Sequence, residues 1–467
     1  MDEVVICVDF GSTFTKAALV DLHEGRLVAK AEHRTTVDTD VMEGFEACSA
    51  SLTAADPRAA DAPVLACSSA GGGLRIAVVG NEQLVTAEAG RRVALSSGGR
   101  VVHVTAGTLD EAGVDALRAA RPDVLLLTGG TDGGNSEVLL ACASALAGAR
   151  WTGPVVVAGN VDAQPDVAAL LDGSATPYVL ADNVVPRIGV LEPASARAAI
   201  REMFLRHVIG GKHLSSSPSF AAMVRGATPD LVLTAVELLA SGLDADRPGV
   251  GDVVVVDVGG ATTDVYSVVE PVEDESDEDE GEARGLSREV VAVSPVNRTV
   301  EGDLGMRWSA VPAVEEAYAA GLLDDVTVGE ARGSAERRRD DPAFLPSTPD
   351  ERAFDVLLAS LAVGVALRRH AGRAQVRFES GGGATGRWVE RSGVDLREVA
   401  LLLGSGGALR HAAEAAEHLL DHVSGAGGWQ VPEGPRVVVD VDYLLAPAGL
   451  LAERHPQAAY RLLQMLG

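Results

Sequence analysis

The sequence contains two near-duplicate stretches, which read VVICVDFGSTFTK at residues 4–16 and VVVVDVGGATTDV at residues 253–265. Each begins with an apolar run, typical of a buried strand, and continues with Asp, one apolar residue and Gly. Small hydroxyl residues follow the Gly, and each stretch then leads into a second apolar run. The repeat predicts two related domains, each with a strand, a tight Gly turn and a second strand.

The repeated pattern suits a nucleotide triphosphate. A strand that ends in Asp9 or Asp257 delivers a carboxylate to the sheet edge, where it can hold Mg²⁺ directly or through water. The Gly lets the backbone turn sharply and approach phosphates, and the exposed N–H groups of such a turn form an anion-binding nest. One copy alone would be interpreted as a plain β-hairpin. Two copies, with a third Gly-rich turn at residue 404, favour ATP and Mg²⁺ held between two facing domains.

The candidate site residues fall into three groups. The predicted catalytic and Mg²⁺-binding carboxylates are Asp9 and Asp257, either of which could position the attacking water. The predicted phosphate-binding residues are Gly11, Ser12, Thr13, Lys16, Gly259, Gly260, Thr262 and Thr263, with Asp264 one step further from the metal. The predicted adenosine-facing residues are Gly404, Gly406 and Gly407. Lys16 either neutralises phosphate charge or lies beyond the turn on the solvated side.

Two further glycine-dense turns follow apolar runs. They read LTGGTDGGN at residues 127–135 and SSAGGG at residues 68–73. The first could bind a second anion at the start of a helix. Rigid packing between sub-domains explains either turn equally well, so both interpretations stay open.

The pattern along the chain predicts an α/β protein with two related domains. Domain I is expected at residues 1–248, with an additional α/β unit at about 60–190, where strand and helix patterns alternate. Domain II is expected at residues 249–467. Its segment 271–286 contains eight acidic residues in ten positions at 273–282, which predicts a self-repelling disordered loop. This run lacks the ligand spacing of an EF-hand Ca²⁺ loop. A charged, Pro-containing loop is also predicted at residues 332–351.

Composition limits the partners and the location. The net charge of −28 disfavours nucleic acid and anionic membranes as partners. The four cysteines have no metal-like spacing, which favours buried free thiols in a reducing compartment. No signal-peptide pattern and no apolar run near ~20 residues is present. These features predict a cytoplasmic protein. No Walker-type GxxxxGK[ST], no HExxH and no supported GxSxG elbow occurs.

With these residues identified, the sequence resembles the ATPase superfamily of actin, sugar kinases and heat-shock chaperones. Residues 9–16 are similar to its first phosphate loop, residues 257–264 to its second, and residues 404–407 to its adenosine loop. The order and spread of the three segments along the chain also match. The resemblance therefore implies that the two related domains are duplicated actin-like (RNase H-like) ATPase domains that face a nucleotide cleft.

A closer resemblance is to the glutamate mutase accessory family, called MutL or GlmL, which is unrelated to the mismatch-repair protein of the same name. The similar phrases are DFGSTFTK (9–16), LTGGTDGGN (127–135), DVGGATTD (257–264) and VEGDLGMR (300–307). The stretch 183–204 is also similar, and the likeness runs from about residue 4 to the C-terminus. Within residues 300–307, Arg307 is expected either to contact phosphate or to form a structural ion pair.

The resemblance implies a protein partner, namely the subunits of an adenosylcobalamin-dependent mutase such as glutamate (methylaspartate) mutase. It implies an ATP-dependent reactivating chaperone that binds ATP and ADP with Mg²⁺, with weak ATPase activity. Composition and spacing by themselves indicate only the nucleotide site. The alternatives are a small-molecule kinase of the same fold, which needs a general-base Asp, and a non-catalytic nucleotide-dependent scaffold. Filament formation is a weaker option.

Overall fold

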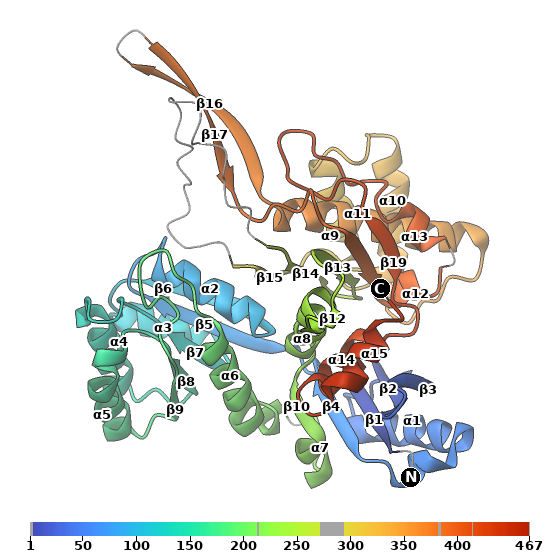
Figure 1. The fold of residues 1–467 in the computed structure, drawn as a ribbon, viewed down its shortest axis with the longest axis horizontal. Coiled ribbons are helices and arrows are strands. Elements are labelled where there is room, and N and C mark those ends of the chain that lie inside the picture. Colours follow the sequence, from blue (N-terminus) through green and yellow to red (C-terminus); the bar gives the residue numbers. More distant parts are fainter. Residues whose placement is uncertain (1–2, 213, 271–293, 382–383, 413, 467) are drawn as a thin grey trace. The chain divides into compact units, whose positions relative to one another are not determined.

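The computed structural model describes residues 3–212, 214–270, 294–381, 384–412 and 414–466. The predicted acidic loop at 271–286 lies outside the described residues. The chain forms two compact units. The first contains the described residues up to Ala235 together with Leu444–Leu463, and the second contains the remaining described residues. Figure 1 labels most of the elements of both units.

The first unit is built on a five-stranded sheet with the order β10-β4-β1-β2-β3. Strands β1 to β3 form an antiparallel meander, whereas β4 runs parallel to β1, and β10 runs parallel to β4. All residues of β1 are buried, as expected for an apolar central strand. The strands are β1 (Val4–Phe10), β2 (Phe14–Asp21), β3 (Arg26–Arg34), β4 (Val64–Ser68) and β10 (Val224–Ala227). The helices next to them in the chain are α1 (Val41–Ala55), α7 (Pro218–Met223) and α8 (Thr228–Ser241).

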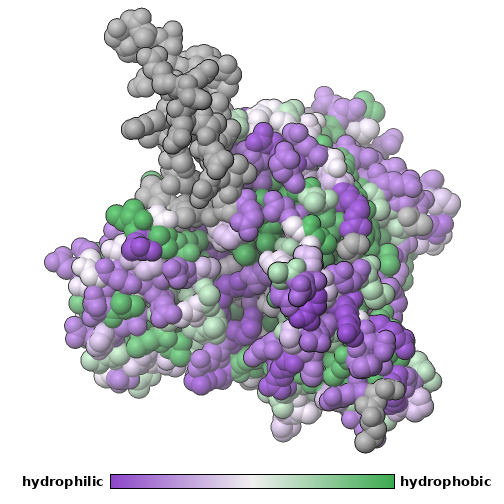
Figure 2. Space-filling model, viewed as in Figure 1, coloured by the Kyte–Doolittle hydropathy of each residue, from purple (hydrophilic) through white to green (hydrophobic). Residues whose placement is uncertain are grey.

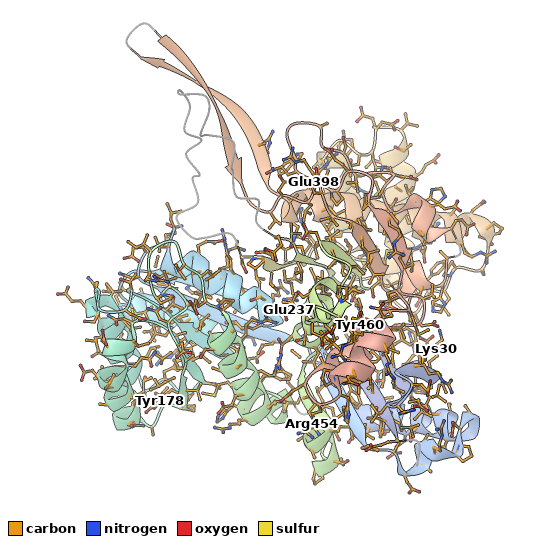
Figure 3. The ribbon with its side chains drawn as sticks, viewed as in Figure 1. Lys30, Tyr178, Glu237, Glu398, Arg454 and Tyr460 are labelled. Atoms are coloured by element: carbon orange, nitrogen blue, oxygen red, sulfur yellow. The ribbon has the colours of Figure 1, made fainter. Side chains whose placement is uncertain are left out.

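The edge strand β3 carries charged side chains, including the exposed Lys30 (Figure 3). An edge strand leaves a row of backbone groups unpaired, and charged residues there oppose pairing with another chain. The polar character of β3, which contrasts with the buried β1 and β2, therefore follows from its position in the sheet.

A second sheet of the first unit has the order β6-β5-β7-β8-β9, and all its strands are parallel. Helices alternate with its strands, which confirms the predicted additional α/β unit. Its strands are β5 (Leu74–Gly80), β6 (Gly99–Ala106), β7 (Val124–Leu127), β8 (Val155–Val157) and β9 (Tyr178–Leu180). Its helices are α2 (Thr86–Ser96), α3 (Glu111–Ala120), α4 (Glu137–Gly148), α5 (Gln164–Ser174) and α6 (Ala194–Met203). Strand β4 falls inside the predicted range 60–190 but belongs to the first sheet, because it pairs with β1.

The second unit is built on a sheet with the order β15-β14-β13-β18-β19. Its strands are β13 (Val253–Val258), β14 (Thr263–Val268), β15 (Val296–Glu301), β18 (Leu401–Ser405) and β19 (Arg436–Val439). Its helices are α9 (Ala310–Ala319), α10 (Thr327–Asp340), α11 (Pro349–His370), α12 (Gly407–Arg410) and α13 (Ala415–His418). Two antiparallel pairs complete it, β11 (Gly242–Asp244) with β12 (Arg247–Pro248), and β16 (Arg373–Gly381) with β17 (Ala384–Ser392).

The main sheets of the two units share one topology. In each, three antiparallel strands form a meander, and two further strands run parallel to its first strand. The registers also correspond, since Asp9 lies opposite Lys16 in β2, and Asp257 lies opposite Asp264 in β14. This repeated RNase H-like arrangement confirms the predicted duplicated actin-like α/β fold.

Two segments differ from the prediction. The loop expected at residues 332–351 is largely helical, because α10 continues to Asp340 and α11 begins at Pro349. The C-terminal helices α14 (Leu445–Ala452) and α15 (Pro456–Leu463), expected within 249–467 as part of domain II, group with the first unit. The reason is packing: α14 is almost wholly buried, and Pro447 accepts a hydrogen bond from the Cys7 thiol of β1.

On the face that Figure 2 shows, hydrophilic residues predominate among the coloured atoms. In the part of the chain that the structure describes, no helix is long and apolar enough to span a membrane. All four cysteines are buried and free, which confirms the interpretation of them as core thiols.

Candidate nucleotide-binding site

The turn between β1 and β2 is closed by a hydrogen bond from the Gly11 amide to the Phe14 carbonyl (3.2 Å). A Cβ atom at Gly11 would lie 2.6 Å from that carbonyl oxygen, so the turn excludes any larger residue. The turn between β13 and β14 is closed in the same way, by a 2.9 Å bond from Gly259 to Thr262. The shared geometry explains why a Gly follows both Asp9-Phe10 and Asp257-Val258 in the sequence.

Neighbouring segments hold the carbonyl groups of both turns. Thr35 donates from its hydroxyl to the Gly11 carbonyl (2.8 Å) and from its amide to the Thr13 carbonyl (2.9 Å). In the second unit, the Gly259 carbonyl accepts a hydrogen bond from the Met306 amide, and the Gly260 carbonyl accepts one from the Arg307 amide. The Ala261 carbonyl accepts one from the Ser309 hydroxyl. The carbonyl oxygens of Gly11, Thr13, Gly259, Gly260 and Ala261 therefore accept hydrogen bonds within the protein.

The amide groups of the turns contrast with the carbonyls. The N–H groups of Ser12, Thr13, Gly260 and Ala261 donate no hydrogen bond to any residue that the structure describes. Ser12 is exposed, and the other three are half-buried. Successive N–H groups without protein acceptors, in a turn whose carbonyls are held elsewhere, have the properties of an anion-binding nest.

The carboxylate of Asp9 is buried, with 4 % of its surface exposed. Its Oδ1 atom accepts a 2.5 Å hydrogen bond from the Thr228 hydroxyl and lies 3.6 Å from the Cys67 thiol. Burial and the nearby Asp9 charge raise the pKa of Cys67 well above its usual value, so the thiol stays protonated and donates. Asp257 is half-buried at the matching position of β13, beside Ser405 of β18.

Lys16 and Asp264 occupy equivalent register positions but differ in charge. Lys16 is half-buried and lies opposite Asp9. Asp264 accepts from Nε (3.0 Å) and Nη2 (2.6 Å) of Arg298, whose side chain is also buried. Because this ion pair already engages one carboxylate oxygen, the structure gives Asp264 a positioning contact that the sequence did not reveal.

The hydroxyl residues of the second turn point in different directions. Thr263 is fully buried and donates to the Leu304 carbonyl (3.1 Å), while Thr262 lies 3.3 Å from Asp264 Oδ2. Arg307 forms an ion pair with Asp355 (3.4 Å), which matches the structural alternative considered for it. The segment 300–307 thus fixes the second turn from one side.

The third Gly-rich turn joins β18 to α12 beside β13. Gly406 has a φ of +112°, and a Cβ atom there would lie 2.2 Å from the Val258 carbonyl oxygen. Gly404 is buried and would clash less severely, with Leu419 at 3.0 Å. Gly407 is exposed, and a Cβ atom there would meet no described atom within 4 Å. The turn therefore lies next to the end of β13, the strand that contains Asp257.

Comparison with known proteins gives one family. The model of the family described as "MutL protein" matches residues 5–466. Protein MutL of Clostridium tetanomorphum is 35 % identical over 474 residues, covering 99 % of this chain and 98 % of the relative. The chain belongs to the MutL family. The family match spans both units, including both phosphate-loop candidates and the additional α/β unit.

Two solved structures match this chain at low sequence identity. Xylulose kinase from Lactobacillus acidophilus matches with a TM-score of 0.30 and 11 % identity, covering 100 % of this chain and 92 % of that chain. The ethanolamine utilization protein EutJ from Carboxydothermus hydrogenoformans matches with a TM-score of 0.28 and 11 % identity, covering 96 % and 88 %.

Besides the Arg298–Asp264 ion pair, two further contacts of the site in this MutL-family chain were not expected from the sequence. The Thr35 hydroxyl donates a hydrogen bond to the Gly11 carbonyl of the first turn, and the Thr228 hydroxyl donates one to the Asp9 carboxylate. A single Thr carries no motif. A weak signal for Thr228 was available, because it follows a short apolar segment and precedes Pro229 at a helix start.

Proposed function

We propose that this MutL-family protein binds ATP with Mg²⁺ and uses it to reactivate an adenosylcobalamin-dependent mutase. The observation that carries the nucleotide part is the duplicated turn, in which carbonyls are held by the protein while successive amides have no described acceptor. In this proposal Ser12, Thr13, Gly260 and Thr262 bind phosphates, and Gly404, Gly406 and Gly407 face the adenosine.

The residues fit Mg²⁺ and a triphosphate in chemical type. Asp9 and Asp257 are hard oxygen ligands at the carboxyl ends of equivalent strands. Mg²⁺ is usually held by one or two carboxylates together with substrate phosphates and water, rather than by a full protein cage. The described residues contain no cluster of three or more His, Cys, Asp or Glu with metal-site geometry, which agrees with this kind of site. When bound, Mg²⁺ would neutralise phosphate charge.

The chaperone part of the proposal rests on family membership. The family resembles accessory proteins of radical mutases, and such mutases stop working when damaged cobalamin stays bound. The proposed task is the release of that cobalamin. Nucleotide binding can drive release only if it favours one of two conformations of the protein. The chain forms two compact units, which are separate bodies in which such a change can occur.

The test measures ATP binding, ATP hydrolysis with Mg²⁺, and recovery of a cobalamin-inactivated glutamate mutase. We expect the wild type to bind ATP and restore the mutase. Asp257→Ala should lose hydrolysis by about tenfold or more, because a metal-binding carboxylate is removed. Asp252→Ala is the matched control, since Asp252 immediately precedes the same strand at its opposite end.

The outcomes separate the rival functions. Hydrolysis without mutase recovery would retain the ATPase and remove the proposed partner. Transfer of the phosphate to a metabolite would identify a kinase, and binding without turnover would identify a scaffold. Absence of ATP binding by the wild type would refute the proposal.

A further inference from the structure

The geometry assigns Thr228 as a positioning residue, which holds the Asp9 carboxylate in the orientation needed to bind Mg²⁺. This inference rests on the proposed function. It concerns a residue at the junction of β10 and α8, outside the two phosphate turns. Its basis is the 2.5 Å hydrogen bond from the Thr228 hydroxyl to Asp9 Oδ1.

The sheet explains how two residues so far apart in sequence meet. Strand β4 lies between β1 and β10, and it pairs Cys67 with Asp9 on one side and Ser68 with Ala227 on the other. Thr228 directly follows Ala227, so it reaches the same carboxyl edge of the parallel strands that Asp9 occupies. The order of the strands, rather than a local motif, brings the hydroxyl to the carboxylate.

Burial makes the contact energetically significant. Asp9 is 4 % exposed and Thr228 is 8 % exposed, so water competes little for their hydrogen bond. An O–H···O⁻ bond of this length is charge-assisted and about twice as strong as a neutral one. The Cys67 thiol, 3.6 Å from the same oxygen, is a weaker second donor. The Thr228 hydroxyl and the Cys67 thiol thus hold Asp9 Oδ1 from two sides.

A purely structural role would be helix capping, because Thr228 is the first residue of α8 and hydroxyl residues are common at helix starts. Capping uses the hydroxyl oxygen as an acceptor, whereas the bond to Asp9 uses the proton. A loss of capping would reduce stability. A loss of positioning would weaken the response to Mg²⁺.

The experiment compares Thr228→Val, which keeps the shape but removes the hydroxyl, with Thr228→Ser, which keeps the hydroxyl. Thr234→Val is the matched control, because Thr234 lies on α8 and donates only within the helix, to Asp230. ATP affinity is measured by calorimetry with and without Mg²⁺, alongside the Mg²⁺ dependence of hydrolysis. Crystal structures of the wild type and Thr228→Val report the Asp9 rotamer.

We expect Thr228→Val to raise the Mg²⁺ concentration for half-maximal ATP binding by about tenfold, in line with loss of a hydrogen bond to a charged group. Affinity without Mg²⁺ should stay unchanged, Thr228→Ser should stay within about twofold of the wild type, and Asp9 should turn in the Val structure. An unchanged Mg²⁺ response and an unmoved Asp9 would overturn the inference. Equal losses in all three variants would also overturn it. If the wild type binds no ATP, the proposed function fails, and the Asp9 rotamer still decides whether Thr228 positions it.

Discussion

Gly406 and Gly407 are adjacent, yet their backbones have different steric requirements. At Gly406, φ is +112° and an added Cβ would lie 2.2 Å from the Val258 carbonyl oxygen. We expect Gly406→Ala to lower the free energy of unfolding by about 2 kcal/mol or more, from strain and displaced backbone. Gly407→Ala should change it by less than about 0.5 kcal/mol. Urea unfolding of both variants checks this, and equal stabilities would contradict it.

His370 is a buried histidine of the second unit, and we expect it to make the stability of the protein depend on pH. Its ring is buried and hydrogen-bonded to the hydroxyls of Ser267 (2.8 Å) and Thr299 (3.0 Å), and burial lowers its pKa to about 4. The unfolded chain, with a pKa near 6.5, binds more protons between these values. The contribution of His370 to stability is therefore complete above pH ~6.5 and declines as the pH falls toward 4.

This linkage predicts the behaviour of His370→Asn. Between pH 7 and 5 the wild type should lose up to ~2 kcal/mol more stability than the variant. The reason is that each pH unit over which the unfolded chain binds one more proton than the folded chain changes the free energy of unfolding by about 1.4 kcal/mol. Chemical unfolding at the two pH values measures this. His23→Asn is the control, since the His23 side chain is 79 % exposed. Identical pH slopes for the wild type and His370→Asn would show that the buried ring does not carry the effect.

At the level of elements, the strands with a sequence signal were predictable, and those defined by pairing were not. The apolar runs of β1 and β13 end in the same Asp-apolar-Gly pattern, so both hairpins follow from local sequence. Strand β10 has only four residues, two of them Gly and Arg. It forms because its backbone pairs in parallel with β4. Tertiary pairing, rather than propensity, decides such a strand.

The same division applies to the candidate site. The repeated Asp and Gly positions could be found because their role is set by backbone geometry within a few residues. The contacts of Thr228 with Asp9 and of Arg298 with Asp264 depend on strand order, which brings together residues 219 and 34 positions apart. The nucleotide-binding roles of these positions, and the cytoplasmic location, stay predictions.

At the scale of the whole chain, the last helices return to the unit in which the chain begins. Helix α14 packs on α8 so closely that a Cβ atom at Gly449 would lie 1.9 Å from the Leu231 carbonyl oxygen. Gly→Ala in a helix normally stabilises by up to ~1 kcal/mol. We expect Gly449→Ala to destabilise instead, by about 2 kcal/mol or more, because the two helix backbones must separate.

Gly333→Ala in α10 provides the opposite case, because a Cβ atom there meets no described atom within 4 Å. The same substitution should therefore raise the melting temperature at residue 333 and lower it at residue 449, and calorimetry on the full chain measures both. If both variants were stabilised, α14 would not be held against α8, and the C-terminal helices would not be an integral part of the first unit. Opposite signs would show that the N-terminal unit depends on the last part of the chain to complete its core.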